Sequence, residues 1–252
     1  MLRYKQNNII AVCSGTKGIG TTWFSCVLSQ TMSFEKQKVL FFDADGGLEN
    51  IAWQLNLKNS DLYVQMLKNK ITLNNAIVSY TKGRFDVIYA NSKENPLIDY
   101  PVGRGQILAF DLKNFAVNYD KVFIDCGNSN IKLKNIFLKL SDMIILMVEP
   151  NLSGLTDAYK ELEHIKNLNT EAKVFVVINR ALSENEGEQI FKTLLNADKQ
   201  FIGMGPKLLG VILQDGRIRD CVLNKITLFE RYPVCQSLAQ IKKISKILID
   251  GG

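Results

Sequence analysis

Histidine is almost absent from this chain, whose 252 residues contain only His164. A single imidazole argues against a histidine-rich metal centre and leaves one residue for any Ser-His-Asp or Cys-His arrangement. His164 lies in the helical pattern "DAYKELEHIK", where we expect an ordinary helix residue. The chemistry must therefore come from other side chains and from the backbone.

Cysteine is also scarce, and it follows no metal or disulfide pattern. The five cysteines are an odd number, are scattered and show no C-x-x-C spacing, which argues against a disulfide framework and a zinc site. We expect buried small apolar residues at these positions: Cys13, Cys26, Cys126, Cys221 and Cys235.

Long apolar runs are missing as well. No run of about 18 apolar residues is present, and the polar start "MLRYKQNN" has no apolar region behind it. Neither a membrane span nor a secretory signal is expected, and the predicted location is the cytosol. The net charge of +6 permits contact with acidic lipid or nucleic acid but indicates neither.

Short apolar runs, in contrast, recur along the whole chain, which is 46% hydrophobic. Most are continuous rather than alternating, as expected for strands buried on both faces of a parallel sheet. The predicted strands are 8–14, 38–45, 84–90, 119–127, 142–150, 172–180 and 207–215. The helix-length segments between them are 20–33, 104–117, 131–140, 153–168, 183–198 and 236–249.

This alternation predicts an α/β fold with a doubly wound, mostly parallel sheet and helices on both faces. No Pro/Gly-rich linker or change of composition divides the chain, so we expect a single domain over residues 1–252. Segment 58–83 is the hardest to assign. In such sheets ligands bind outside the carboxyl ends of the strands, where this sequence is unusually polar.

The first of those strand ends carries the stretch "AVCSGTKGIGTTWFS", residues 11–25. Its spacing is that of a phosphate-binding loop, in which backbone N–H groups and a following helix, beginning near Trp23, face phosphate oxygens. Thr22 would direct its hydroxyl to Mg²⁺, but Thr21 stands where a lysine normally spans the β- and γ-phosphates. Taken alone, the loop could equally be a tight strand-to-helix turn.

Aspartates at the ends of two other strands favour a nucleotide site. "FFDADGGLEN" contains Asp43 and Asp45, and "VFIDCGNSN" contains Asp125. An aspartate at such a strand end can hold Mg²⁺ through water, and a second can orient the attacking water. Each alone could be a helix cap or turn residue, but these features converge on one crevice.

Together, the segments "SGTKGIGTT", "VLFFDADGGLENIAWQL", "YDKVFIDCG", "DMIILMVEPNLSGLTDAYKELEHI", "VFVVINRALSENEG" and "LLGVILQDGRIRDCVLNKITLFERYP" resemble the MinD/ParA group of deviant Walker-A ATPases. The match keeps its order over nearly the whole chain. Within the group, "DADGGLENI", "LTDAYKELE" and "NRALSENEG" resemble FlhG (FleN) regulators of flagellar number and placement.

The resemblance implies ATP or ADP with Mg²⁺, an ATP-sandwich dimer, and cycling between cytosol and membrane. It assigns water positioning to Asp45, metal contacts to Thr22, Asp43 and Asp125, and the start of switch II to Cys126 and Gly127. The implied nucleotide contacts are Gly15, Thr16, Lys17, Gly18, Ile19, Gly20, Thr21, Thr22 and Trp23, with Asn179, Arg180 and the Gln214–Asp215 pair near the adenine.

The chain departs from the group's K-G-G-x-G-K-[ST] pattern at both lysines, which align with Thr16 and Thr21. Lys17 occupies the slot of the first glycine and could supply charge from there. We therefore expect weak nucleotide binding with little or no hydrolysis. The G-T-[ST] ending is similar to the pilus-assembly proteins CpaE and TadZ, which keeps a pilus role open.

The C-terminal segment "QSLAQIKKISKILIDGG" has an apolar stripe and lysines elsewhere. It fits a basic amphipathic membrane helix, but we favour a last helix packed on the sheet. In FlhG and MinD the membrane-targeting helix follows this region, and "MLRYKQNN" lacks an evident FlhF-stimulating motif. Both points argue against membrane cycling and against an FlhF partnership, while peripheral association with the inner membrane stays open.

The resulting prediction is an FlhG-like regulator that self-associates and binds a flagellar or pilus assembly protein. The alternatives are a scaffold that binds no nucleotide and an active ATPase that uses Lys17. No nucleic-acid-binding motif is legible in the sequence, so nucleic acid is not an expected partner.

Overall fold

One sheet runs through the computed structural model, which describes residues 8–46, 50–90, 100–127 and 131–251. Its order is β3-β4-β2-β5-β1-β6-β7-β8. All neighbouring pairs are parallel except the edge pair β3 and β4. The strands are β1 (Ile9–Ser14), β2 (Val39–Asp43), β3 (Val78–Tyr80), β4 (Phe85–Ile88), β5 (Lys121–Asp125), β6 (Met143–Val148), β7 (Lys173–Ala181) and β8 (Lys207–Leu213).

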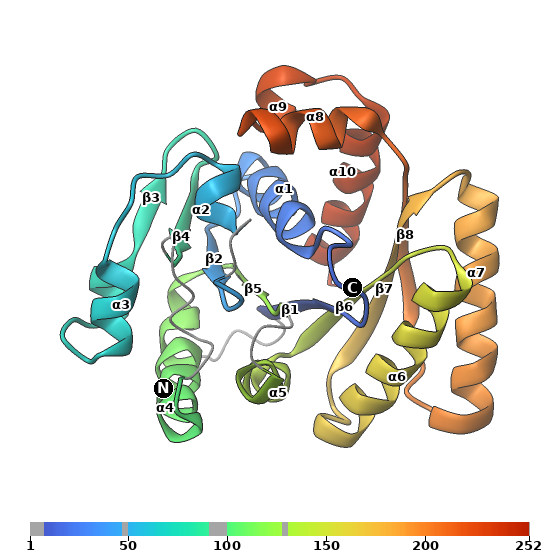
Figure 1. Ribbon diagram of the computed structural model, residues 1–252, viewed down its shortest axis with the longest axis horizontal. Coiled ribbons are helices and arrows are strands. Elements are labelled where there is room, and N and C mark those ends of the chain that lie inside the picture. The colour runs from blue at the N-terminus through green and yellow to red at the C-terminus, as the bar shows by residue number, and fades with distance from the viewer. Residues whose placement is uncertain (1–7, 47–49, 91–99, 128–130, 252) are drawn as a thin grey trace.

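Helices cover both faces of this sheet (Figure 1). The α-helices are α1 (Thr21–Phe34), α2 (Ile51–Gln54), α3 (Leu62–Leu67), α4 (Val102–Phe115), α5 (Ile131–Leu140), α6 (Leu152–Leu168), α7 (Glu184–Ala197), α8 (Gly216–Asn224), α9 (Leu228–Arg231) and α10 (Gln236–Ile249). Single turns are η1 (Asn74–Ala76), η2 (Ala116–Asn118) and η3 (Asp198–Ile202). The doubly wound α/β fold predicted from the sequence is confirmed.

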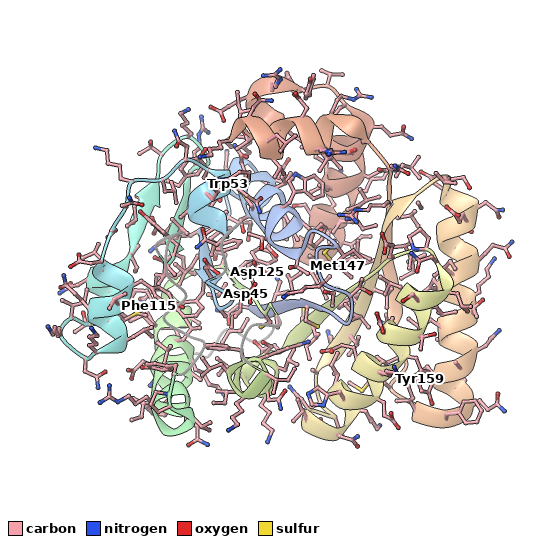
Figure 2. All side chains as sticks on the ribbon, viewed as in Figure 1. Asp45, Trp53, Phe115, Asp125, Met147 and Tyr159 are labelled. Atoms are coloured by element: carbon pink, nitrogen blue, oxygen red, sulfur yellow. The ribbon has the colours of Figure 1, made fainter. Side chains whose placement is uncertain are left out.

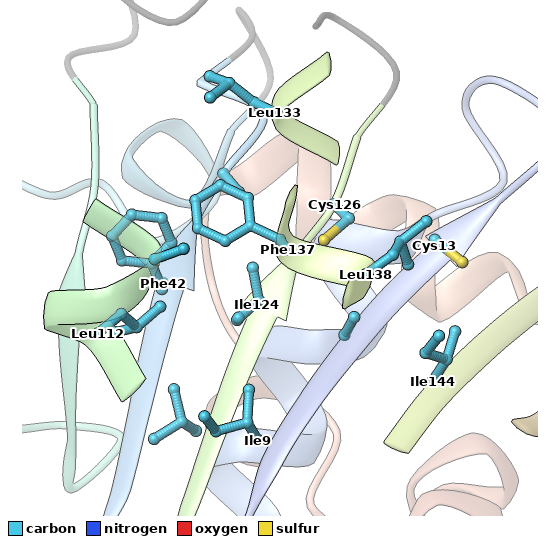
Figure 3. Packing of buried hydrophobic residues seen from close by; sticks show 14 of the residues in the cluster. Ile9, Cys13, Phe42, Leu112, Ile124, Cys126, Leu133, Phe137, Leu138 and Ile144 are labelled. Carbon is cyan, nitrogen blue, oxygen red and sulfur yellow. The ribbon is translucent and has the colours of Figure 1, made fainter. Parts of the chain in front are cut away.

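Two separate apolar cores lie on the two faces. One forms under α4 to α7, where Leu112 and Phe137 are fully buried (Figure 3). Leu162 of α6 belongs to the same core. The other forms under α1 and α10, around Phe24 and Ile241. Every residue of β1, β2, β5 and β6 is buried, which explains their unbroken apolar sequences.

Some expected boundaries differ from the structure. The helix expected near Trp23 begins at Thr21, so the loop before it is shorter. The unassigned segment 58–83 contains α3, η1 and β3, each too short to give a clear periodic pattern.

All five cysteines lie in the described ranges and are buried and unpaired, as expected. His164 is an α6 residue whose Nε2 lies 2.7 Å from Asn135 Oδ1.

The C-terminal helix packs on the sheet. The stripe residues of α10 are buried against β8 and α1: Leu238, Ile241, Ile244, Ser245 and Leu248. That stripe is therefore covered in this structure, and the packed alternative is confirmed. Among the described residues, no helix combines the length and apolarity needed to cross a bilayer.

Truncating one buried side chain of this stripe should destabilise the folded protein. Ile241 is 0% exposed, so we expect Ile241→Ala to lower the free energy of unfolding by about 2–4 kcal/mol, measured by urea denaturation. Ile247, which is 43% exposed on the same helix, provides the control, and Ile247→Ala should cost less than about 1 kcal/mol. Equal, small effects would contradict the packing of α10.

Candidate nucleotide site

The carboxyl ends of the parallel strands meet at one edge, where the chain reverses direction across the sheet. β1 lies between β5 and β6, with β2 to β5 all on one side of it and β6 to β8 on the other. This is the switch point at which doubly wound sheets bind ligands. A pocket of about 1330 Å³ opens there, bordered by the 17–23 segment and by residues after β6, β7 and β8.

The glycine-rich loop forms one wall of the pocket. Gly18 and Gly20 have φ angles of 75° and 99°, values that residues with a Cβ rarely adopt. Gly20 is the N-cap of α1, and no side chain among the described residues forms a cap hydrogen bond at that end of the helix. Free N–H groups at a helix N-terminus and a positive helix dipole give the loop the local character of an anion site.

Gly15 and Thr16, in contrast, do not line the pocket. The Thr16 hydroxyl donates to Asp157 Oδ2 on α6 at 3.2 Å. A Cβ on Gly15 would lie 2.4 Å from the Asp157 carbonyl oxygen. The first half of the loop is therefore pressed against α6, and only the segment from Lys17 to Trp23 faces the pocket.

This close approach gives a test of the loop's packing. Gly15→Ala would press the new Cβ against the Asp157 backbone, so we expect it to lower the free energy of unfolding by about 1–3 kcal/mol in thermal or urea denaturation. Gly103 in α4 has open space where its Cβ would stand, and Gly103→Ala should be neutral or slightly stabilising. A Gly15→Ala protein as stable as the parent would show that the loop does not pack this way.

Two buried aspartates lie at the neighbouring strand ends, where Asp43 of β2 and Asp125 of β5 are register partners. Both are 0% exposed. Asp43 Oδ1 accepts from the backbone of Gly46 at 2.9 Å, and Asp125 Oδ2 accepts a short hydrogen bond from the Thr22 hydroxyl. Their other oxygens, Asp43 Oδ2 and Asp125 Oδ1, have no hydrogen-bond partner among the described residues.

Burial raises the pKa of Asp43 to about 7, and the neighbouring Asp45 adds to that shift. Burial and the nearby Asp43 raise the pKa of Asp125 to about 8, although hydrogen bonds from Thr22 and Thr21 oppose the shift. Two carboxylates out of water without a cation favour their protonated forms. The donor set of a hydroxyl and two unsatisfied carboxyl oxygens is the kind of oxygen site that suits Mg²⁺.

Asp45 and Asp125 lie close together near the middle of the sheet's edge (Figure 2). Asp45 lines the pocket and packs directly on Gly127, where any Cβ would overlap its carboxylate. Asp43 and Asp125 do not border the pocket. Both are fully buried at the strand ends, where Asp125 contacts the pocket residue Thr22. The structure thus brings Thr22, Asp43, Asp45 and Asp125 together, as predicted.

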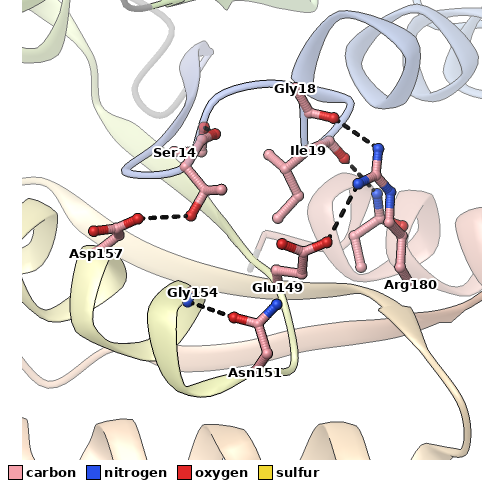
Figure 4. A network of polar contacts seen from close by, with 10 residues as sticks. Ser14, Gly18, Ile19, Glu149, Asn151, Gly154, Asp157 and Arg180 are labelled. Atoms are coloured by element: carbon pink, nitrogen blue, oxygen red, sulfur yellow. Dashed lines mark hydrogen bonds and ion pairs between the residues drawn. The ribbon is translucent and has the colours of Figure 1, made fainter.

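Asn179 and Arg180, expected near the adenine, line the pocket directly beside the loop. Asn179 Nδ2 donates to the Ile19 carbonyl at 2.7 Å, while its buried Oδ1 has no partner in the described chain. Arg180 donates to the Gly18 carbonyl at 2.6 Å and pairs with Glu149 at 3.3 Å (Figure 4). Sequence reasoning missed the Glu149 contact, because nothing in the order of residues pairs it with Arg180.

Asp215 also lines the pocket, but its carboxylate already has several protein partners. Its Oδ1 accepts from the backbone and side chain of Arg217 at 3.0 Å, and its Oδ2 accepts from Ser237 at 2.7 Å. These bonds lower its pKa despite partial burial. Asp215 therefore caps α8 and joins it to α10, and its contact with a base stays a prediction.

A protein-family profile described as an AAA domain matches residues 7–178. The chain belongs to this family. The antiactivator FleN of Pseudomonas aeruginosa is 24% identical over 243 residues, covering 94% of this chain and 85% of FleN. The flagellum site-determining protein YlxH of Helicobacter pylori is 26% identical over 198 residues, covering 78% of this chain and 66% of YlxH.

Solved structures agree on the fold. The cell division ATPase MinD of Pyrococcus furiosus superposes with a TM-score of 0.79 at 21% identity, covering 97% of this chain and 98% of MinD. MinD of Pyrococcus horikoshii, solved with Mg-ADP, gives 0.78 at 21% identity, covering 96% and 95%. This AAA-domain chain therefore has a MinD-like fold, and its sequence is similar to that of FleN.

Proposed function

We propose that this MinD/ParA-type protein binds ATP or ADP with Mg²⁺, hydrolyses ATP slowly or not at all, and regulates flagellar number or placement. One observation carries the nucleotide part. The loop, with its positive-φ glycines and uncapped helix, faces a pocket at the switch point, and unsatisfied aspartate oxygens lie at the adjoining strand ends, next to Thr22. A Mg-nucleotide supplies the anion and the cation that these groups fit.

The roles follow from position. Thr22, Asp43 and Asp125 would hold Mg²⁺, directly or through water, and the ion would neutralise phosphate charge when bound. Asp45, which lines the pocket beside Gly127, would position the attacking water. Lys17 to Trp23 would contact phosphates through backbone N–H groups, with Asn179 and Arg180 near the base. Gly15 and Thr16 would support the loop from behind rather than touch nucleotide.

The expected slow hydrolysis rests on the charges around the loop. Thr21 offers no cation at the position of the family lysine, and Thr16 is turned toward Asp157. Among the described residues, the basic side chains that line the pocket are Lys17, Arg180 and Arg219, and Arg180 is already paired with Glu149. If Lys17 replaced the lost charge, the protein would turn over, and Asp45→Asn would abolish that turnover.

Thermal unfolding with and without Mg-ATP separates the proposal from a scaffold that binds no nucleotide. A ligand at about 100 times its dissociation constant stabilises the folded state by about 2.7 kcal/mol, so millimolar Mg-ATP should raise the melting temperature. No shift and no calorimetric heat at millimolar Mg-ATP would support the scaffold instead. Size-exclusion chromatography under the same conditions tests nucleotide-linked self-association.

The flagellar part is supported by FleN and YlxH, whose names place them in flagellar control. Deleting the gene from its own cell should change the number or position of flagella, counted by electron microscopy. Normal flagella together with altered pili would favour the pilus-assembly alternative, and an unchanged surface would contradict both roles.

A further inference from the structure

A lysine is buried underneath the phosphate loop. Lys134 in α5 is 2% exposed, and its Nζ lies 2.7 Å from Glu161 Oε1 on α6 and 3.3 Å from the Ser14 carbonyl oxygen. Glu161 is 9% exposed. Lysines are almost never buried to this extent unless they are paired. Lys134 is not among the residues that line the nucleotide pocket, so its contacts point to a role behind the loop.

These contacts join three parts of the site. Ser14 is the last residue of β1, and its hydroxyl donates to the Thr16 carbonyl at 2.7 Å, within the loop. Lys134 belongs to the helix that follows β5 and Asp125. Glu161 lies one turn along α6 from Asp157, which holds Thr16. The start of the loop is therefore tied to both helices.

The surroundings of Lys134 would accept an apolar side chain. Leu133, Phe137 and Leu138 on the same helix are all buried at 0% exposure. Replacing a buried ion pair with well-packed apolar residues is often neutral or stabilising, so such a pair is weak evidence of a purely structural role. What an apolar residue could not supply is the hydrogen bond to the Ser14 carbonyl.

We propose that Lys134, oriented by Glu161, is a positioning residue for the phosphate loop. It fixes the start of the loop on the helix that follows Asp125, so that the phosphate side and the metal side of the site keep one relative position. Neither residue replaces the lysines missing at Thr16 and Thr21. The inference rests on the proposed function only in its nucleotide readout, since loop order can be measured without ligand.

Three variants separate positioning from stability. Lys134→Met leaves Glu161 buried without its cation and should lower the melting temperature by more than about 6 °C. Lys134→Met/Glu161→Leu removes both charges and should recover most of that loss. Glu161→Gln keeps an acceptor for Lys134 and should keep the Ser14 contact. Lys139→Met, at an exposed position of the same helix, is the matched control.

The deciding measurement is hydrogen exchange of the backbone amides of residues 15–22 in the nucleotide-free full chain. We expect exchange about tenfold faster in Lys134→Met and in the double variant, with rates like the parent's in Glu161→Gln and Lys139→Met. The dissociation constant for a fluorescent ATP analogue with Mg²⁺ should rise about tenfold in the same two variants.

A double variant that regains stability and also keeps the parent's exchange rates would overturn the proposal, because the pair would then be structural only. If Lys134→Met unfolds, the double variant and Glu161→Gln still decide the question. A parent that binds no nucleotide, but whose loop exchanges faster in the double variant, would contradict the proposed function and support the positioning role.

Discussion

Thr21→Lys should raise the rate of ATP hydrolysis by about 10²–10³-fold. A lysine at this position spans the β- and γ-phosphates and stabilises the charge that develops during transfer. Thr21 is the first residue of α1 and lines the pocket, so a longer side chain at this position would begin next to the phosphate loop. Steady-state phosphate release with Mg-ATP measures the gain.

Thr21→Met is the control for this prediction, since it extends the side chain without adding charge. It should hydrolyse ATP no faster than the parent. A Thr21→Lys protein that is also no faster than the parent would contradict our account of the defect. It would mean that another cation, such as Lys17, already supplies the charge, or that the loop cannot hold a γ-phosphate.

Asp125→Asn should have opposite effects on the free and the ligand-bound protein. Burial holds the pKa of Asp125 at about 8, far above the usual value near 3.8, so the folded state binds this proton more tightly than the unfolded chain. The resulting stability is full below about pH 4 and is lost as pH rises toward 8. Asparagine removes the ionisation, and without Mg²⁺ we expect it to stabilise the protein by about 3–5 kcal/mol at pH 8.5.

With Mg-ATP the parent should be more stable than Asp125→Asn, because the variant loses a carboxylate proposed to hold Mg²⁺. The melting temperature at pH 5 and pH 8.5, with EDTA or with Mg-ATP, measures both effects. Asp111→Asn, at an exposed position of α4, is the control and should behave like the parent in all four conditions. An Asp125→Asn protein that is less stable than the parent at pH 8.5 in EDTA would show that Asp125 is not a destabilising buried acid.

The fold was predictable because its strands are buried on both faces. Runs such as "IIAVCS" and "MIILMV" have no polar interruption, and each is a fully buried strand of the sheet. The short edge strand β3 was not predictable, since Val78–Tyr80 is too brief to show a period and is fixed by pairing with β4. Its conformation depends on a tertiary contact rather than on its own sequence.

The candidate site also has features that the sequence predicts and features that it does not. Asp43, Asp125 and the loop were predicted because the two aspartates end strands and the loop follows one, and the topology brings strand ends together. Three contacts were not predicted: the hydrogen bond from Thr16 to Asp157, the ion pair of Arg180 with Glu149, and the buried ion pair of Lys134. Each joins residues far apart in the chain, so each depends on how helices pack on the sheet.

The most direct test is equilibrium dialysis of the protein against radiolabelled Mg-ATP at millimolar concentration, with the identity of the nucleotide on the protein side determined over several hours. We predict that the bound nucleotide stays mainly ATP. The site has the loop backbone and the metal-site oxygens for binding, but it has threonine at position 21, where the family has a lysine. Protein that carries no nucleotide, or protein whose bound ATP is converted to ADP within minutes, would contradict this prediction.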